Sequence, residues 1–393
     1  MNQSSQVLLA SKPRFEILDG LRGVAAIIVV CFHLFETYSP GPTGQIVNHG
    51  YLAVDFFFML SGFVIGYAYD DRWSRGMTQS DFYKRRLIRL EPMLVMGVLL
   101  GALWFYFGDA PGFHLMMATP WWKVVVIMLL SFIMFPIPPT YDIRGWGENS
   151  PLNGPQWSLL WEYVANILYA AIVRRFSKAG LSILVALSGV LTVLLCCDID
   201  LFGLLEARKW AAYTPIGGWA VTPDQIYIGL SRLMFPFFGG LLLYRLGLRL
   251  KFSKGFIVTS IILALILCMP HIGGNKANIF NGLYNTIAIM LLFPVIVAAG
   301  AGSELAGKKT TAACKWLGAI SYPLYITHYP LIYLQMSWAQ RHPDAPLGTH
   351  IFMSVCIFII AIASAYACLK LYDEPVRTWL KNKFLRKPVK TVE

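Results

Sequence analysis

Charged residues are scarce in this 393-residue chain, where Asp, Glu, Lys and Arg together make up 14% of the sequence. Hydrophobic residues make up 56%, and apolar runs of spanning length recur from end to end. No soluble domain, long linker or internal repeat is visible. The composition excludes an ordinary soluble domain and predicts one all-α, polytopic integral-membrane domain over residues 1–393.

Cysteine motifs are also missing. The seven cysteines lie mostly inside apolar runs, and they include no CxxC pair and no spacing suited to a metal ion. We interpret them as small apolar side chains and expect no metal site.

The net charge of +12 does not indicate a nucleic-acid partner, because Lys and Arg form short clusters between apolar runs. Such clusters favour the cytoplasmic side of a membrane. They lie at 84–89, 174–178, 245–254, 308–309 and 377–390.

No small-x-small cleavage site follows the first apolar run, so we expect that run to remain in the protein. Windows of about 20 apolar residues predict about ten spans. These lie near 17–37, 50–69, 87–107, 157–174, 179–197, 225–244, 255–270, 279–299, 316–337 and 348–370.

An eleventh apolar piece, 121–138, is short and ends in a Pro-rich run. If it crossed the membrane, the basic clusters at 84–89 and 174–178 would lie on opposite sides. We therefore predict a re-entrant or interfacial segment. Both tails, 1–15 and 377–393, are then cytoplasmic.

Three spans carry ionisable residues that a membrane tolerates poorly. A rise of about 1.5 Å per residue places His33, Asp55 and Glu162 at similar depth near the outer face. An imidazole oriented by a carboxylate away from bulk water is a typical acid/base site. The alternative is that each residue pairs privately and only stabilises packing.

Arg86 and Arg89 lie three residues apart at the cytoplasmic start of the third span, where two guanidinium groups can bind phosphates. The alternative is ordinary positive-inside anchoring. Ser321, Tyr325 and His328 follow at i, i+4 and i+7 on one helix face, and this polar stripe either lines a channel or makes interhelical hydrogen bonds.

Five fragments in this order resemble the acyltransferase-3 family of membrane proteins, best known for O-acetylating sugars. They are "LDGLRGVAAIIVVCFH", "GYLAVDFFFMLSGFVI", "KRRLIRLEP", "WSLLWEYV" and "SYPLYITHYPLI". The resemblance covers nearly the whole chain. Arg22 and His33 match the first motif of the family, and this match assigns Arg22 to the catalytic group together with His33, Asp55 and Glu162. Arg86 and Arg89 match the second motif.

The resemblance implies transfer of an acyl group, usually acetyl, from cytoplasmic acyl-CoA to a hydroxyl at the outer face. Arg86 and Arg89 would hold the coenzyme phosphates, and the pantetheine arm would pass Ser321, Tyr325 and His328. His33 would then act as a base or form an acyl-histidine. An esterase-like domain often follows the last span in this family, and we expect none in this chain, so a partner for a second step would be another chain.

A carbohydrate or glycan acceptor and a location in a bacterial inner membrane are expected from the habit of the family. Aromatic residues of the outer loops could stack on sugars, and they could equally belong to a membrane-interface belt. The alternative function is a proton-coupled exporter that uses His33, Asp55 and Glu162 as a relay, although no inverted repeat supports it.

Overall fold

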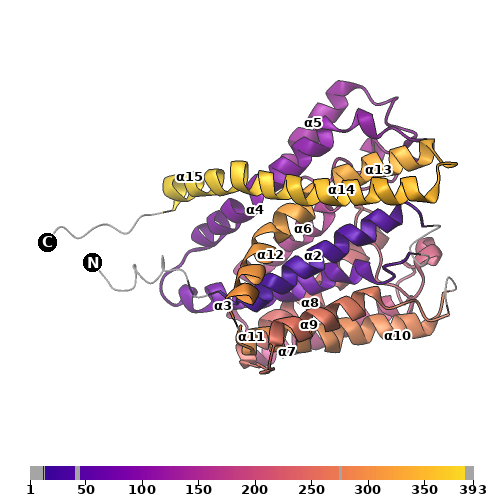
Figure 1. Cartoon of the computed structure of the whole chain (residues 1–393). Coiled ribbons are helices and arrows are strands. Elements are labelled where there is room, and N and C mark those ends of the chain that lie inside the picture. The colour runs from indigo at the N-terminus through magenta and orange to yellow at the C-terminus, as the bar shows by residue number, and fades with distance from the viewer. Residues whose placement is uncertain (1–11, 13, 40–44, 274–276, 306, 386–393) are drawn as a thin grey trace.

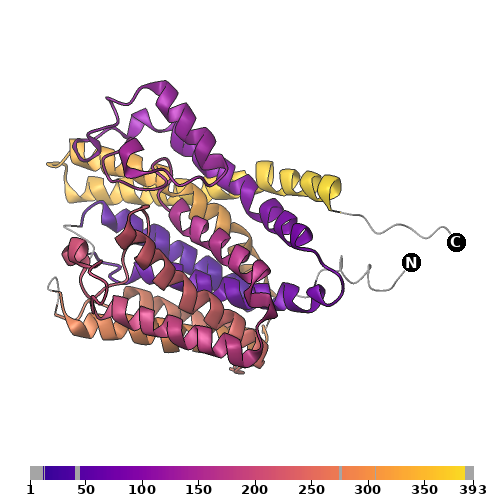
Figure 2. The same cartoon turned by 180° about the vertical axis from the view of Figure 1, so that it is seen from behind.

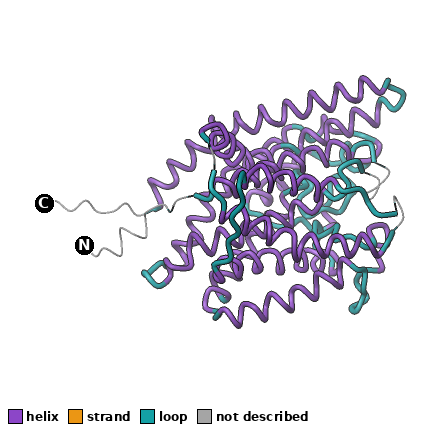
Figure 3. Tube along the Cα trace, turned by 60° about the horizontal axis from the view of Figure 1, so that its bottom comes forward, coloured by secondary structure: helices purple, strands orange, loops and turns teal. Residues whose placement is uncertain are grey.

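The computed structural model of the chain describes residues 12, 14–39, 45–273, 277–305 and 307–385. Within these residues the secondary structure is helical and contains no strand (Figure 3). This confirms the predicted all-α class.

The helices follow one another closely along the chain. They are α2 (Glu16–Glu36), α3 (Ala53–Trp73), α4 (Gln79–Leu103), α5 (Trp121–Phe132), α6 (Gln156–Ala171), α7 (Lys178–Cys196), α8 (Pro223–Leu246), α9 (Gly255–Cys268), α10 (Ile279–Ile287), α11 (Phe293–Gly302), α12 (Lys308–Thr327), α13 (Tyr329–Arg341), α14 (Leu347–Cys368) and α15 (Glu374–Phe384). One π-helical turn joins α10 to α11, and another joins α14 to α15.

Six helical segments of the described chain are long and apolar enough to cross a membrane, which is fewer than the ten spans predicted. They are Glu16–Glu36, Gly50–Trp73, Lys178–Cys196, Pro223–Leu246, Ile279–Gly302 and Leu347–Phe384. The remaining predicted spans are helical as well, but α4 begins with a charged turn and α6 has only 16 residues. The count of ten is therefore not confirmed.

The predicted span 316–337 consists of two helices. Helix α12 ends before His328, and α13 begins after it. Pro330 lacks the N–H that would bond to the carbonyl of Ile326 in a continuous helix. The side-chain amide of Asn153 donates to that carbonyl oxygen instead, at 2.8 Å. The carbonyl of Ile326 thus keeps a donor at the break, and the bond connects α12 to the loop before α6.

Small residues let the central helices approach closely. In α3, a Cβ at Gly62 would overlap the carbonyl of Phe237 in α8, and a Cβ at Gly240 in α8 would overlap the carbonyl of Met59. Backbones without a Cβ between them pack tightly in membrane bundles. The pairing of α3 with α8 fixes one wall of the site described below.

The start of α2 and the end of α15 lie at the same end of the molecule (Figure 1). The long connections before α6 and before α8 lie at the opposite end (Figure 2). Helix α14 runs along the outside and exposes apolar side chains such as Phe352 and Ile359. An exposed apolar face of this kind suits contact with lipid.

Candidate active site

Two cavities lie one behind the other between the helices. The outer cavity, beside the long connections, has a volume of about 440 Å³ and contains His33 in its wall. The inner cavity has a volume of about 100 Å³ and is lined by Arg22, Arg86 and Arg89. Val54 and Tyr325 line both cavities.

His33 lies in the last turn of α2 and is paired with a carboxylate of the same helix. Its Nδ1 lies 2.7 Å from Oε2 of Glu36, at the i, i+3 spacing that places both side chains on one face. The hydroxyl of Tyr329 also donates to this carboxylate oxygen, at 3.4 Å. A carboxylate that accepts from Nδ1–H leaves the lone pair on Nε2, which is the form of imidazole that can take a proton.

The connection before α6 forms a second wall of the outer cavity around a tight turn. The carboxylate of Asp142 accepts from four backbone N–H groups, at 2.6 to 2.9 Å, in the turn that follows it. The turn directs the buried Arg144 onto the ring of Tyr333, with 3.5 Å between guanidinium carbon and ring centroid. The contact between Arg144 and Tyr333 thereby fixes the connection before α6 to the packed helices.

Glu148 lies on this wall and faces the outer cavity. The hydroxyl of Tyr333 donates to its Oε2 at 3.2 Å. Burial raises the pKa of Glu148 to about 7, and the charge of the nearby Arg144 only partly offsets this. Glu148 therefore carries a proton at a pH where an exposed glutamate is ionised.

Aromatic side chains cover much of the remaining wall of the outer cavity. Four indoles line it: Trp146, Trp157, Trp210 and Trp219. The two long connections that supply most of them are joined where the backbone N–H of Asn149 donates to the carbonyl of Trp219, at 2.7 Å. Flat aromatic faces beside carboxylates can hold a ring that has both apolar and hydroxyl-bearing faces.

The inner cavity combines cations with a single carboxylate. Arg86, almost fully buried, donates to Oε1 of Glu162 at 2.6 Å, and Ser61 donates to the same oxygen at 2.8 Å. Arg22 donates to Ser321 at 2.9 Å and to Asp19 at 3.0 Å. Arg89, which is exposed, also lines the cavity. Three guanidinium groups in the wall of one cavity favour an anionic ligand.

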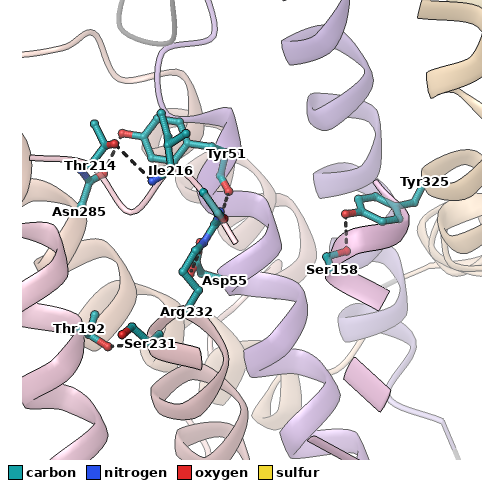
Figure 4. A network of polar contacts seen from close by, with 11 residues as sticks. Tyr51, Asp55, Ser158, Thr192, Thr214, Ile216, Ser231, Arg232, Asn285 and Tyr325 are labelled. Atoms are coloured by element: carbon teal, nitrogen blue, oxygen red, sulfur yellow. Dashed lines mark hydrogen bonds and ion pairs between the residues drawn. The ribbon is translucent and has the colours of Figure 1, made fainter. Parts of the chain in front are cut away.

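The expected convergence of His33, Asp55 and Glu162 is not found. Asp55 is paired in the interior with Arg232 of α8, at 2.7 Å (Figure 4). It lines neither cavity. Glu162 is occupied by Arg86 in the inner cavity. In this structure Glu36 is the carboxylate bonded to His33, whereas Asp55 and Glu162 each have an arginine partner from another helix.

The polar stripe of α12 is divided between the two cavities. Ser321 lines the inner cavity, and Tyr325 lies where the two meet. His328 lines neither cavity and is fully buried, with its ring 5.4 Å from the ring of His33. Its Nε2 has no hydrogen-bond partner among the described residues. Ser321 and Tyr325 thus border the cavities, whereas His328 lies behind His33.

Three residues of the site were missed from the sequence. Glu36 was detectable from its i, i+3 spacing to His33, and Arg232 from its position as a lone cation inside an apolar run. Glu148 had no such signal, because only the folding of its loop brings it to the cavity. In the described part of the chain, no group of three or more His, Cys, Asp or Glu side chains is placed to hold a metal ion.

A helical membrane bundle with a paired histidine and a cationic cavity is the arrangement expected of a membrane acyltransferase. The profile of a family described as an acyltransferase domain matches residues 15–370. The chain belongs to this family, which confirms the resemblance to acyltransferase-3 proteins.

Curated relatives extend the comparison. A putative peptidoglycan O-acetyltransferase, YrhL of Bacillus subtilis, is 24% identical over 94% of this chain and 56% of its own length. The peptidoglycan O-acetyltransferase OatA of Listeria monocytogenes is 25% identical, with the same coverage. "Protein 2 in picA locus" of Rhizobium radiobacter is 31% identical over 47% of this chain and 96% of its own length.

The chain therefore spans little more than half the length of the two O-acetyltransferases. No solved structure matches it.

Proposed function

We propose that the protein is a membrane-bound O-acyltransferase that moves an acetyl or other acyl group from cytoplasmic acyl-CoA to a hydroxyl of a glycan in the outer cavity. The observation that carries the proposal is the pairing of His33 with Glu36 on the wall of a cavity that abuts a second one lined by three arginines. The family and the O-acetyltransferase relatives support the same class of reaction.

The inner cavity is assigned to the donor. Arg86 and Arg89 hold the coenzyme phosphates, joined by Arg22, which lines this cavity and not the outer one. Arg22 is thus assigned to binding of the donor and not to catalysis together with His33. The coenzyme arm then passes Ser321 and reaches Tyr325 at the junction of the cavities. Acyl-CoA is found in the cytoplasm of a bacterial cell, and the inner cavity opens to that side. Both chain ends then face the cytoplasm.

The reaction follows from the position of His33. Its Nε2 removes the proton of the acceptor hydroxyl, and the oxygen attacks the thioester carbonyl carbon. The new C–O ester bond forms as the C–S bond breaks, and the leaving thiolate takes up the proton from the imidazolium. Glu36 stabilises the positive charge on His33 during transfer, and such base catalysis contributes about 10²- to 10⁴-fold in rate.

The acceptor is assigned to the outer cavity. Four indoles and the carboxyl groups of Glu36 and Glu148 suit a sugar ring, which has an apolar face and hydroxyl edges. The names of two relatives associate those proteins with peptidoglycan, and a cell-surface glycan is the corresponding proposal here.

The first test uses purified protein in detergent with acetyl-CoA and a glycan acceptor, with release of CoA as the measurement. Wild-type protein should release CoA, and His33→Ala should lose transfer while it still binds acetyl-CoA, because the arginines supply the affinity for the donor. His342→Ala is the matched control, since His342 is exposed and lines neither cavity.

Transfer by His33→Ala at the wild-type rate would contradict the role of His33. A wild-type protein that neither binds nor cleaves acetyl-CoA would contradict the proposed acyltransferase activity. That result would favour the alternative function, a proton-coupled exporter.

A further inference from the structure

The junction between the two cavities is formed by two side chains. Of all the lining residues, Val54 of α3 and Tyr325 of α12 are shared by the outer and inner cavities. A group that passes from the donor cavity to His33 therefore passes the isopropyl group of Val54 and the phenol ring of Tyr325.

Tyr325 is held in this position from several sides. Its hydroxyl lies 2.7 Å from Oγ of Ser158 in α6, as Figure 4 shows, and 3.4 Å from the carbonyl of Pro155. The ring of Phe57 meets it edge-on, with centroids 5.4 Å apart. A ring fixed by a hydrogen bond and an aromatic contact does not yield easily to a larger ligand.

Val54 is equally restricted. It lies in the first turn of α3, one residue before Asp55, whose buried ion pair with Arg232 joins α3 to α8. Its side chain is 8% exposed. The backbone on this side of the junction is thus fixed by the close packing of α3 against α8, and the width of the junction is set by the side chains themselves.

We propose that Val54 and Tyr325 restrict the transferred group to acetyl and are specificity-determining residues for the acyl donor. This inference rests on the proposed function. The sulfur and the coenzyme arm lie on the inner side, and the acceptor hydroxyl approaches from the outer side. The carbonyl carbon must then lie at the junction, and the acyl chain has only the space between these two side chains while the acceptor fills the outer cavity.

The chain offers a matched series of valines for the test. Val29 lines the outer cavity alone, Val64 lines the inner cavity alone, and Val54 lines both. Val→Ala at each position removes the same atoms from a different part of the route. The measurement is kcat/KM for CoA release with acetyl-CoA, propionyl-CoA and butyryl-CoA, each with the same glycan acceptor.

Val54→Ala should raise the ratio of propionyl-CoA to acetyl-CoA on the order of tenfold, the discrimination typical of one methylene in a fitted pocket. Val29→Ala and Val64→Ala should leave the ratio within about twofold of wild type. Val54→Leu should lower the ratio, which tests the junction in the opposite direction. Elution volume in gel filtration and melting temperature show that each variant is folded.

Equal ratios in the three Val→Ala variants would overturn the inference while the proposed function stands. So would a wild-type enzyme that uses butyryl-CoA as well as acetyl-CoA. No CoA release by wild-type protein from any of the three donors would refute the proposed function and this inference with it.

Discussion

Glu36 is the residue that most directly tests the geometry of the histidine. If its bond to Nδ1 holds His33 in the reactive tautomer, Glu36→Gln removes the charge that stabilises the imidazolium and should lower kcat by roughly 10²-fold or more. The KM for acetyl-CoA should change little, because Glu36 lines the outer cavity only.

Steady-state kinetics separates the two parameters. Glu16→Gln is the control, since Glu16 lies in the first turn of the same helix and contacts Lys315. A fall in kcat of equal size in both variants would show a general effect of charge on α2 and not a role for Glu36.

Arg89 separates phosphate binding from membrane anchoring. Anchoring depends on positive charge and not on its shape, so Arg89→Lys would be silent if that were its role. If Arg89 binds phosphate, lysine loses the planar pair of donors and should weaken acetyl-CoA binding by roughly 1 to 3 kcal/mol.

Isothermal titration measures this difference. Arg85→Lys provides the control, because Arg85 belongs to the same basic cluster but does not line the inner cavity. Unchanged affinity in both variants would remove the coenzyme phosphates from this opening.

At the scale of elements, α5 decides the topology. Its 12 residues reach about 18 Å, whereas the hydrocarbon core is about 30 Å thick. The re-entrant or interfacial path predicted for 121–138 requires both flanks of α5 to lie outside. Ala118→Cys and Thr140→Cys, both at exposed positions, should therefore react with an impermeant thiol reagent from the periplasmic side of a cysteine-free protein.

Lys84→Cys, in the basic cluster at the start of α4, should react only after the membrane is permeabilised. If only one of the two cysteines that flank α5 is labelled from the periplasmic side, the chain between them crosses the membrane.

For the whole molecule, the protonation of Glu148 couples stability to pH. Its pKa is raised from 4.5 to about 7 in the folded protein, so the folded state keeps a proton that the unfolded state loses. The contribution of Glu148 is fully present below about pH 4.5 and is lost as pH rises through about 7. Glu148→Gln removes this dependence because the amide does not titrate.

Melting temperatures of wild-type protein and Glu148→Gln in detergent, from about pH 5 to about pH 8, measure the effect. The difference, wild type minus variant, should fall as pH rises. A constant or rising difference would show that the cavity wall does not hold Glu148 protonated.

The sequence by itself determined the class of protein, its helical nature and the residues around which the site is built. Composition and apolar run length are local properties, and they indicate a membrane bundle without knowledge of packing. Motif spacing likewise singled out His33, Arg86 and Arg89, all of which line one of the two cavities.

Only the tertiary structure decided which charges meet. Asp55 pairs with Arg232, 177 positions away, and Glu162 pairs with Arg86, 76 positions away. The rise per residue gives the depth of each group along its helix but not the side of the helix on which it lies. A buried carboxylate pairs with whichever cation the packing brings close to it. The division of the interior into two cavities, and the choice of Val54 and Tyr325 at their junction, follow from the same packing.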